Sequence, residues 1–240
     1  MKRATGYLTA LCLLALIISQ SIIIVTFFMP FYHWQYDRMR NYPPFNGRSA
    51  VETIGTPHEE LIYVTVELLD YMRGRRDTLD GIRATVNGVE REFFSDLEKR
   101  HMIDVRVLYD ILFAVRNISF FLGTALVIGM LIFRVPLLRL ICICSRQIIG
   151  GFLVIAGITT GVISLNFDRA WTVFHLIFFN NDYWILTHRV DLLVDMVSLS
   201  FFLHICIFLG LIILAKSIAV IVVCTMYINR TKRSFGRGRS

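Results

Sequence analysis

Two histidines of the chain lie among residues that could take part in proton transfer. His101 stands between Glu98 and Asp104, so on a helix a carboxylate would lie about one turn to either side of its imidazole. A neutral imidazole can act as general base and general acid near neutral pH, and a neighbouring carboxylate can fix its tautomer. His175 lies in the run FHLIFFNNDYWIL, residues 174–186, where two asparagines and an aspartate interrupt aromatic residues. These residue types suit acid–base catalysis, but spacing alone does not distinguish a catalytic histidine from a structural one.

Acyl transfer is one reaction that such a pair could support, provided that donors stabilise the developing oxyanion. The candidate donors are Arg116, Asn180, Asn181 or a backbone N–H group, and the sequence does not choose among them. A metal site formed by the two histidines and Asp104 is an alternative, but no paired spacing of the H-E-x-x-H type is present. We therefore expect no metal. The sequence also lacks a glycine-rich phosphate loop, a G-x-S-x-G elbow and a nucleic-acid-binding motif.

The helices that would position these residues are predicted to cross a membrane. Hydrophobic residues make up 55% of the 240 residues, which is too apolar for an ordinary soluble domain. A helix that crosses a bilayer needs about 20 mainly apolar residues. Four segments qualify: Tyr7–Met29, Ile111–Phe133, Ile148–Phe167 and Val197–Ile228. The first apolar run is too long for a signal peptide and has no small-residue cleavage site, so we expect an uncleaved anchor. The predicted fold class is an all-α membrane protein with four transmembrane helices.

The distribution of charge predicts the orientation of these spans in the cell membrane. Basic residues without acidic ones precede the first span, connect the second to the third, and follow the fourth, whereas all 18 acidic residues lie in the other two connections. Basic loops stay in the cytoplasm, so we expect both termini to be cytoplasmic. The net charge of +7 is then a topology signal and not a nucleic-acid-binding surface. The expected parts are residues 1–29 (cytoplasmic start and first transmembrane helix), 30–110 (extracytoplasmic domain), 111–133 (second helix), 134–147 (cytoplasmic loop), 148–167 (third helix), 168–196 (extracytoplasmic interfacial or re-entrant segment), 197–228 (fourth helix) and 229–240 (basic cytoplasmic tail).

The first extracytoplasmic part is predicted to be a small, mainly helical domain. Thr56-Pro57-His58-Glu59 has the pattern of a capping box at a helix start, with Thr56 as the cap, and Gly74 is a plausible stop. Asn87-Gly88 marks a turn. Ser95-Asp96-Leu97-Glu98 is a second capping box, and the helix that it opens meets no breaker before the second span.

The second extracytoplasmic part contains an aromatic run over residues 170–180 that is too short to cross the membrane. It is typical of a helix that lies in the interface between water and lipid. One face of this helix would carry four rings, those of Trp171, His175, Phe178 and Phe179. His175 and His101 would then approach each other at the depth of the lipid headgroups, on the extracytoplasmic side.

Two longer runs around these histidines resemble the motifs of a known family. Residues 94–105, FSDLEKRHMIDV, match F-S-x-x-E-x-x-H-M-x-D-V, and residues 174–184, FHLIFFNNDYW, match F-H-x-x-F-F-x-x-D-x-W. Both motifs are similar to those of the lipoprotein intramolecular transacylases of Gram-positive bacteria, which share the predicted four-span layout. The chain departs from the family after Trp184, where a proline-containing stretch and a later F-P-x-x-F-F motif have no prolines here. This difference bears on the local backbone and on substrate preference.

The resemblance implies a site and a reaction. The matching positions are His101 and His175 as catalytic residues, with supporting positions at Glu98, Met102, Asp104, Asn180, Asp182 and Trp184. These enzymes move one acyl chain from the sn-2 ester of a diacylglyceryl-modified cysteine to the α-amine of that cysteine, which gives a lyso-form lipoprotein. The implied partners are such lipoproteins and membrane lipid, and no cofactor is implied.

The roles within the pair follow as a hypothesis. His101, held by Glu98 or Asp104, would take the proton from the amine, and His175 would polarise the ester or protonate the leaving oxygen. The two roles could be swapped, and both direct transfer and a covalent acyl-enzyme stay open.

Two other functions also fit the residues. The chain could be a non-enzymatic membrane sensor or accessory subunit whose outer domain binds a partner, in which case the histidines would be dispensable or would sense pH or metal. It could also be an acyltransferase that draws on phospholipid. Transport is disfavoured because the spans carry few polar residues and show no repeat. The sequence does not predict an oligomeric state.

Overall fold

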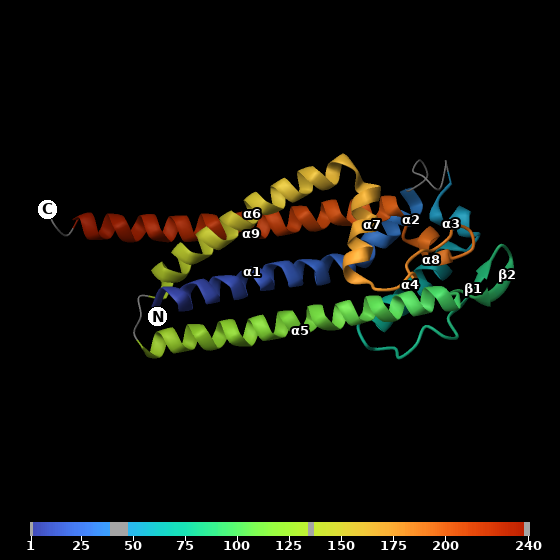
Figure 1. Cartoon of the computed structure of the whole chain (residues 1–240), viewed down its shortest axis with the longest axis horizontal. Helices are drawn as coiled ribbons and strands as arrows, with labels where there is room; N and C mark the ends of the chain where they lie inside the picture. Colours follow the sequence, from blue (N-terminus) through green and yellow to red (C-terminus); the bar gives the residue numbers. More distant parts are fainter. Residues whose placement is uncertain (1, 39–47, 134–136, 238–240) are drawn as a thin grey trace. The chain divides into compact units, whose positions relative to one another are not determined.

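The structure, a computed structural model, describes residues 2–38, 48–133 and 137–237. It is mostly helical, and Figure 1 shows its elements coloured along the chain. The described residues divide into two compact units. The membrane unit comprises the chain up to Ile24, Leu112–Leu165 and the chain from Phe208 onward, and the hairpin unit comprises Val25–Ile111 and Asn166–Ile207.

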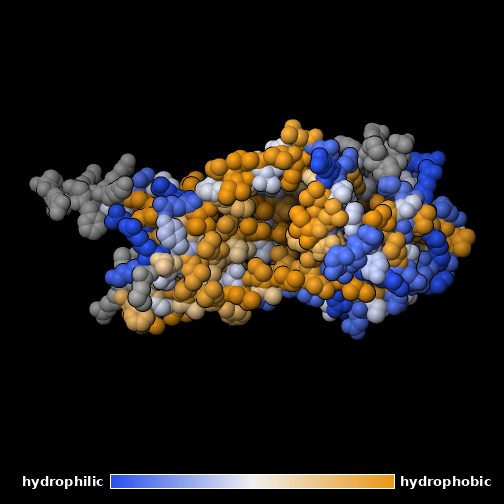
Figure 2. Space-filling model, in the orientation of Figure 1, coloured by the Kyte–Doolittle hydropathy of each residue, from blue (hydrophilic) through white to orange (hydrophobic). Residues whose placement is uncertain are grey.

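The membrane unit is built from the long helices α1 (Lys2–Thr26), α5 (Asp96–Ile132), α6 (Leu137–Leu165) and α9 (Leu199–Arg237). Each contains a stretch that is long and apolar enough to cross a bilayer. Large apolar side chains on these helices are exposed in the protein alone, and Figure 2 shows hydrophobic residues along them. Exposure on this scale is expected of surfaces that face lipid. The prediction of a multi-pass membrane protein with four spanning helices is confirmed.

The helices extend beyond the apolar segments that the sequence marked. As predicted, α5 runs without a break from its capping box into the apolar stretch, and because seven of residues 96–110 are charged, its apolar part begins after them. The expected loop 134–147 is helical from Leu137 onward, since α6 begins there, and the tail is helical as far as Arg237. Residues 134–136 of that loop and 238–240 of the tail lie outside the described residues.

The hairpin unit contains the first part of α5 and several shorter elements. These are α2 (Met29–Arg38), α3 (Ala50–Ile54), α4 (His58–Met72), β1 (Arg83–Val86), β2 (Val89–Glu92), α7 (Phe167–Phe178) and α8 (Leu192–Met196). Helix α4 is amphipathic and buries Leu61, Val64 and Leu68. The hydroxyls of Tyr36 and Thr65 share a hydrogen bond of 2.8 Å, which joins α2 to α4.

The predicted capping box at Thr56 is wrong. Pro57 is the residue before the first turn of α4, with an extended backbone (ψ 142°), and no side chain caps this helix. The Thr56 hydroxyl is buried and makes no hydrogen bond within the described chain. A capping box that we did not predict opens α3 instead, between Ser49 and Glu52. The predicted stop at Gly74 agrees with the end of α4 at Met72, because Gly74 has a φ of 73°.

The expectation of an all-α protein is corrected by the antiparallel hairpin of β1 and β2, in which Val86 pairs with Val89. The Asn87-Gly88 turn was predicted, but the strands were not. Both turn residues are left-handed, with φ of 52° and 81°, and this is the backbone that a two-residue hairpin turn requires. The Asn87 N–H donates to the Gly55 carbonyl at 2.9 Å and ties the hairpin to the end of α3.

Candidate active site

The start of α5 is fixed by a capping box, as the sequence predicts. The Ser95 Oγ accepts from the Glu98 N–H at 3.2 Å, and Glu98 Oε2 accepts from the Ser95 N–H at 2.5 Å. The other carboxylate oxygen of Glu98 accepts a hydrogen bond from the Leu193 N–H. Ser95 Oγ also donates to Asp191 Oδ1 at 2.9 Å. Two long-range bonds therefore tie the first turn of α5 to residues 191–193.

The expected contact between Glu98 and His101 is not formed. Glu98 is fully buried, and each of its oxygens accepts from a backbone N–H group. Burial raises the pKa of Glu98, although the hydrogen bonds from Leu193 and Ser95 oppose this effect. Glu98 thus holds the helix that carries His101 and does not orient the imidazole directly.

His101 is 8% exposed, and its Nδ1 has no hydrogen-bond partner among the described residues. Its ring centroid lies 5.2 Å from that of Phe179 and 6.0 Å from that of His175. Burial lowers the pKa of His101 from 6.5 to about 4, and His175 acts in the same direction while Asp104 opposes it. His101 is therefore a neutral imidazole at physiological pH.

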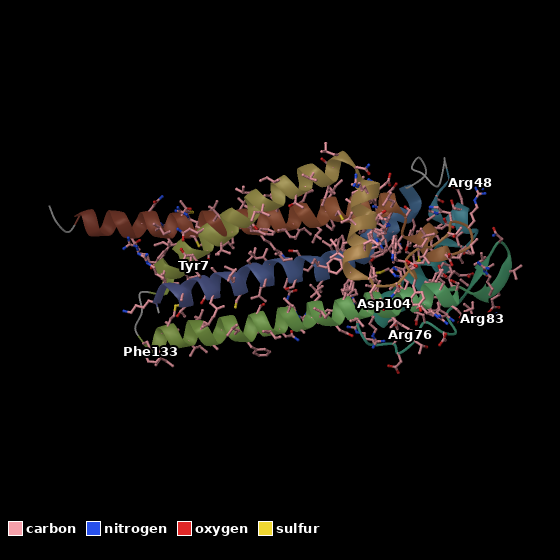
Figure 3. All side chains as sticks on the ribbon, viewed as in Figure 1. Tyr7, Arg48, Arg76, Arg83, Asp104 and Phe133 are labelled. Carbon is pink, nitrogen blue, oxygen red and sulfur yellow. The ribbon has the colours of Figure 1, made fainter. Side chains whose placement is uncertain are left out.

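Asp104, the other predicted partner of His101, is bonded to a different residue. Its Oδ2 accepts from Asn181 Nδ2 at 2.8 Å, and Asn181 Oδ1 accepts from the Tyr183 N–H at 3.1 Å. Figure 3 labels Asp104 on α5, beside the end of α7. The carboxylate thus acts on His101 through its charge and holds the chain that follows α7.

His175 comes from α7, which Asn166 caps by accepting from the Arg169 N–H at 2.9 Å. Its Nδ1 lies 2.8 Å from the Trp171 carbonyl oxygen, one turn earlier. Because a carbonyl only accepts, Nδ1 must carry the hydrogen, and the Nε2 of the neutral ring is left as the acceptor. Burial lowers the pKa of His175, although the bond to Trp171 opposes it. The ring is thereby held neutral in one tautomer.

Aromatic rings surround this imidazole. Its centroid lies 4.3 Å from that of Trp171, 5.3 Å from Phe174 and 4.7 Å from Trp184, which is stacked on it. The predicted helix face is correct for Trp171 but not for the end of the run. Helix α7 ends at Phe178, whose side chain is exposed, and the extended backbone of Phe179 turns that ring toward both histidines.

The remaining predicted residues divide into two groups. Trp184 is in the site, and its indole N–H is buried without an acceptor among the described residues. Met102 is buried next to His101 in the chain and offers no polar group. Asn180 and Asp182 are exposed, and their side chains make no hydrogen bond within the described chain. Of the predicted oxyanion donors, Asn181 is engaged with Asp104, and Arg116 donates to Asn117 in the membrane unit.

The site therefore combines two neutral imidazoles with an indole N–H that lacks an acceptor. One imidazole has a free lone pair at a known nitrogen, which is what a general base requires. The indole N–H is a donor of the kind that stabilises an oxyanion. Among the described residues, no three His, Cys, Asp or Glu side chains gather as a metal site. The arrangement is suited to acid–base acyl transfer among aromatic rings.

Comparisons with known proteins agree with this chemistry. Residues 7–202 match the family described as "Lipoprotein intramolecular transacylase Lit". None of the curated proteins compared matches the chain significantly.

Solved structures of the transacylase Lit from Bacillus cereus share the fold. One is 18% identical, with a TM-score of 0.72 and coverage of 98% of both chains. A variant of that protein with a histidine replaced by arginine is 19% identical, with a TM-score of 0.70 and coverage of 98% of this chain and 94% of the other. At this level of sequence identity, the likeness to the solved structures supports the fold alone. The family match extends over most of the chain and does not favour the non-enzymatic alternative. The chain belongs to the lipoprotein intramolecular transacylases, a family of membrane acyltransferases that act on lipoproteins.

Proposed function

We propose that His101 and His175 form the centre at which the acyl chain is transferred. The chain would move from the sn-2 ester of a diacylglyceryl-modified lipoprotein to the α-amine of its N-terminal cysteine, giving the lyso-form. The observation that carries this proposal is the 2.8 Å hydrogen bond from His175 Nδ1 to the Trp171 carbonyl, beside a second buried imidazole. It supports His175 as the base, which is the swapped version of the roles that the sequence suggested first.

His175 Nε2 takes the proton of the attacking amine. The amine nitrogen bonds to the ester carbonyl carbon while the proton passes to Nε2. The C–O bond to the glyceryl group then breaks, and the imidazolium returns the proton to the glyceryl oxygen. The products are an amide on the cysteine and a free glyceryl hydroxyl, so bonds and protons balance without a further reactant. The amine has an ordinary pKa of about 7.7–8.0, which a neutral imidazole matches well.

His101 acts as a neutral hydrogen-bond donor. Its pKa of about 4 makes it a poor source of a full proton at pH 7, but a neutral imidazole keeps one N–H that can polarise a carbonyl. The Trp184 indole N–H, which stacks against His175, is the second donor to the oxyanion. Positive charge on His175 lowers the pKa of His101, so when His175 takes the proton of the amine, His101 stays neutral.

Direct transfer fits the site better than an acyl-enzyme. Ser95 is the serine next to the helix that bears His101, and its hydroxyl donates to Asp191 and accepts from the Glu98 N–H. It is therefore committed to the capping box. Because donor ester and acceptor amine belong to one molecule, much of the rate acceleration would come from orientation.

We further propose that the site faces the extracytoplasmic side and that both termini are cytoplasmic. The basic residues at the start of α1, from residue 134 into the start of α6, and from the end of α9 onward support this orientation, because short basic segments remain inside. Modified lipoproteins carry their acyl chains in the outer leaflet, which is where such a site would meet them.

The test is tandem mass spectrometry of a reporter lipoprotein in a host that leaves diacylglyceryl-cysteine with a free amine. The wild-type chain should give an acyl group on the α-amine and remove one chain from the glyceryl group. His101→Ala and His175→Ala should leave the reporter unchanged at equal membrane expression. His33→Ala is the matched control, because it removes an exposed histidine of the same unit outside the pair. An unmodified reporter with the wild-type chain, or full modification by either site variant, would contradict the proposal.

A further inference from the structure

The hairpin unit has a polar cavity, of about 470 Å³, that the proposed reaction does not use. It is lined by the end of α3, the hairpin turn and the segment around α8. Three arginines from three parts of the chain line it: Arg48, Arg91 and Arg189. Its volume is in the range of ligand-binding pockets and exceeds what a single small ion needs.

Positive charge is in excess among the described residues that line this cavity, because three arginines stand against one carboxylate, that of Asp195. None of its three arginines forms an ion pair with a described carboxylate. Asp195 also lines the cavity, but its Oδ1 accepts from His188 Nδ1 at 3.0 Å and its Oδ2 from the Arg189 N–H at 2.9 Å. Guanidinium groups bind carboxylates through paired N–H donors. The cavity therefore suits an anionic ligand.

Side chains alternate between the two faces of the hairpin, so Arg91 and Arg83 lie on opposite faces. Arg91 pairs with Ala84 and shares the face of Val86 and Val89, which also line the cavity. Arg83 lies on the opposite face and forms an ion pair with Glu90 at 2.9 Å. Two arginines of one hairpin thus have different surroundings, which provides a matched control.

The cavity is connected to the catalytic pair through the segment that carries Arg189 and Leu192. This segment is bonded to the first turn of α5 by the Leu193 N–H to Glu98 and by Asp191 to Ser95. Along α5, Glu98 lies before His101, and the apolar stretch lies after it. A substrate with its acyl chains toward the apolar stretch and its cysteine at His101 would direct its polypeptide toward Glu98 and this cavity.

We propose that the cavity binds acidic side chains of the lipoprotein polypeptide that follows the modified cysteine. This inference rests on the proposed function, because it places the cysteine at the histidine pair. A polypeptide is favoured over a lipid headgroup because the segment that lines the cavity is bonded to Glu98, which precedes His101 along α5, whereas the apolar stretch follows it. The three arginines would thus select substrates by charge, separately from the acyl-transfer chemistry.

The test compares two synthetic diacylglyceryl-cysteine lipopeptides that are identical except for three glutamates or three glutamines after the cysteine. Turnover is measured in micelles of non-ionic detergent by mass spectrometry of the N-acylated product. An exposed arginine–carboxylate pair changes affinity by up to about fivefold, so three pairs predict a preference of roughly tenfold for the acidic lipopeptide in kcat/KM. High salt should reduce this preference.

The arginine variants show which residues cause the preference for the acidic lipopeptide. Arg91→Ala and Arg189→Ala should each lower it about twofold without changing the turnover of the glutamine lipopeptide, and Arg91→Glu should lower it further. Arg83→Ala should leave it unchanged. Equal turnover of both lipopeptides by the wild-type chain would overturn the inference. A second outcome would also overturn it. If turnover of the glutamine lipopeptide required anionic phospholipid, and Arg91→Ala removed that requirement, the cavity would be assigned to lipid headgroups.

Binding to the inactive His101→Ala variant separates this inference from the proposed function. Tighter binding of the acidic than of the neutral lipopeptide supports the cavity assignment even if the wild-type chain turns over neither. Equal binding of the two by this variant overturns the cavity assignment and leaves the proposed reaction untouched.

Discussion

Replacing Glu98 by glutamine tests whether the start of α5 positions the catalytic pair. The two carboxylate oxygens accept from the backbone N–H groups of Ser95 and Leu193 at a fully buried position. Glutamine offers only one acceptor oxygen, so one of these donors loses its partner. A buried unsatisfied donor costs about 1–3 kcal/mol, and in a chain of this length each kcal/mol lowers Tm by about 2–4 °C. We expect Glu98→Gln to lower the apparent Tm by roughly 2–12 °C.

Activity should fall with this loss because His101 lies on the same helix, less than one turn from Glu98. A displacement of about 1 Å in a catalytic group can cost up to about a hundredfold in rate. We expect kcat of Glu98→Gln to fall by roughly tenfold to a hundredfold. Thermal unfolding is followed by tryptophan fluorescence in detergent, because two of the three tryptophans, Trp171 and Trp184, contact His175.

Glu52→Gln is the matched control for this experiment. Glu52 closes the same kind of capping box at α3, with its Oε2 2.7 Å from the Ser49 N–H, but its side chain is exposed and water can replace the bond. Its Tm should therefore fall less and its kcat should not change. A Glu98→Gln protein with the Tm and kcat of the Glu52→Gln control would refute the positioning role of Glu98.

Three further predictions concern the site itself. The logarithm of kcat/KM should rise with a slope of about one between pH 6.5 and 7.5, because the substrate amine must lose its proton while burial lowers the pKa of both imidazoles below 6.5; a second ionisation with its inflection at or above pH 6.5 would show that a histidine titrates at its ordinary pKa. Trp184→Phe keeps a stacking ring and removes the indole N–H, so kcat should fall by roughly a hundredfold with little change in KM; a loss of less than threefold would exclude this donor. Asp104→Asn removes the charge that raises the pKa of His101, so the histidine signal in an NMR titration should move to a lower pH than in the wild type, and a move to higher pH would contradict the assigned electrostatics.

The features predicted correctly from the sequence depend on residues close together in the chain. The Ser95–Glu98 capping box follows from a spacing of three, and the continuation of the helix into the apolar stretch follows from the absence of glycine and proline over residues 96–122. The four spans follow from the length of apolar runs alone. Proximity of the two histidines was also predicted correctly, because both were expected at the same depth beside the membrane.

The partners of the site carboxylates could not be predicted in this way. Glu98 bonds to Leu193 and Asp104 to Asn181, and such long-range pairs leave no periodic signal. The helical spacing that placed Glu98 near His101 led to the wrong partner, because a carboxylate that closes a capping box turns back toward the helix start.

The residues after α7 show a second limit. We extended the helical face through Phe179, but the backbone is extended there and brings the ring into the site by a different route. Asn181 therefore reaches Asp104, while the neighbouring Asn180 and Asp182 remain exposed. The donor role of Trp184 was missed because its ring was assigned to the membrane interface. An indole N–H near a candidate catalytic histidine was the signal that could have indicated it.

The most direct test of the account measures kcat for His101→Ala, His175→Ala and the double variant on one synthetic diacylglyceryl-cysteine lipopeptide. Proton transfer by a positioned side chain contributes about 10²–10⁴-fold and an oxyanion donor about 10²–10³-fold, so each single variant should lose activity on this scale at an unchanged Tm. Because the two imidazoles act in the same transition state, the double variant should be little worse than the poorer single variant. Wild-type kcat in either single variant, or losses that multiply fully in the double variant, would contradict a reaction centre formed by the pair.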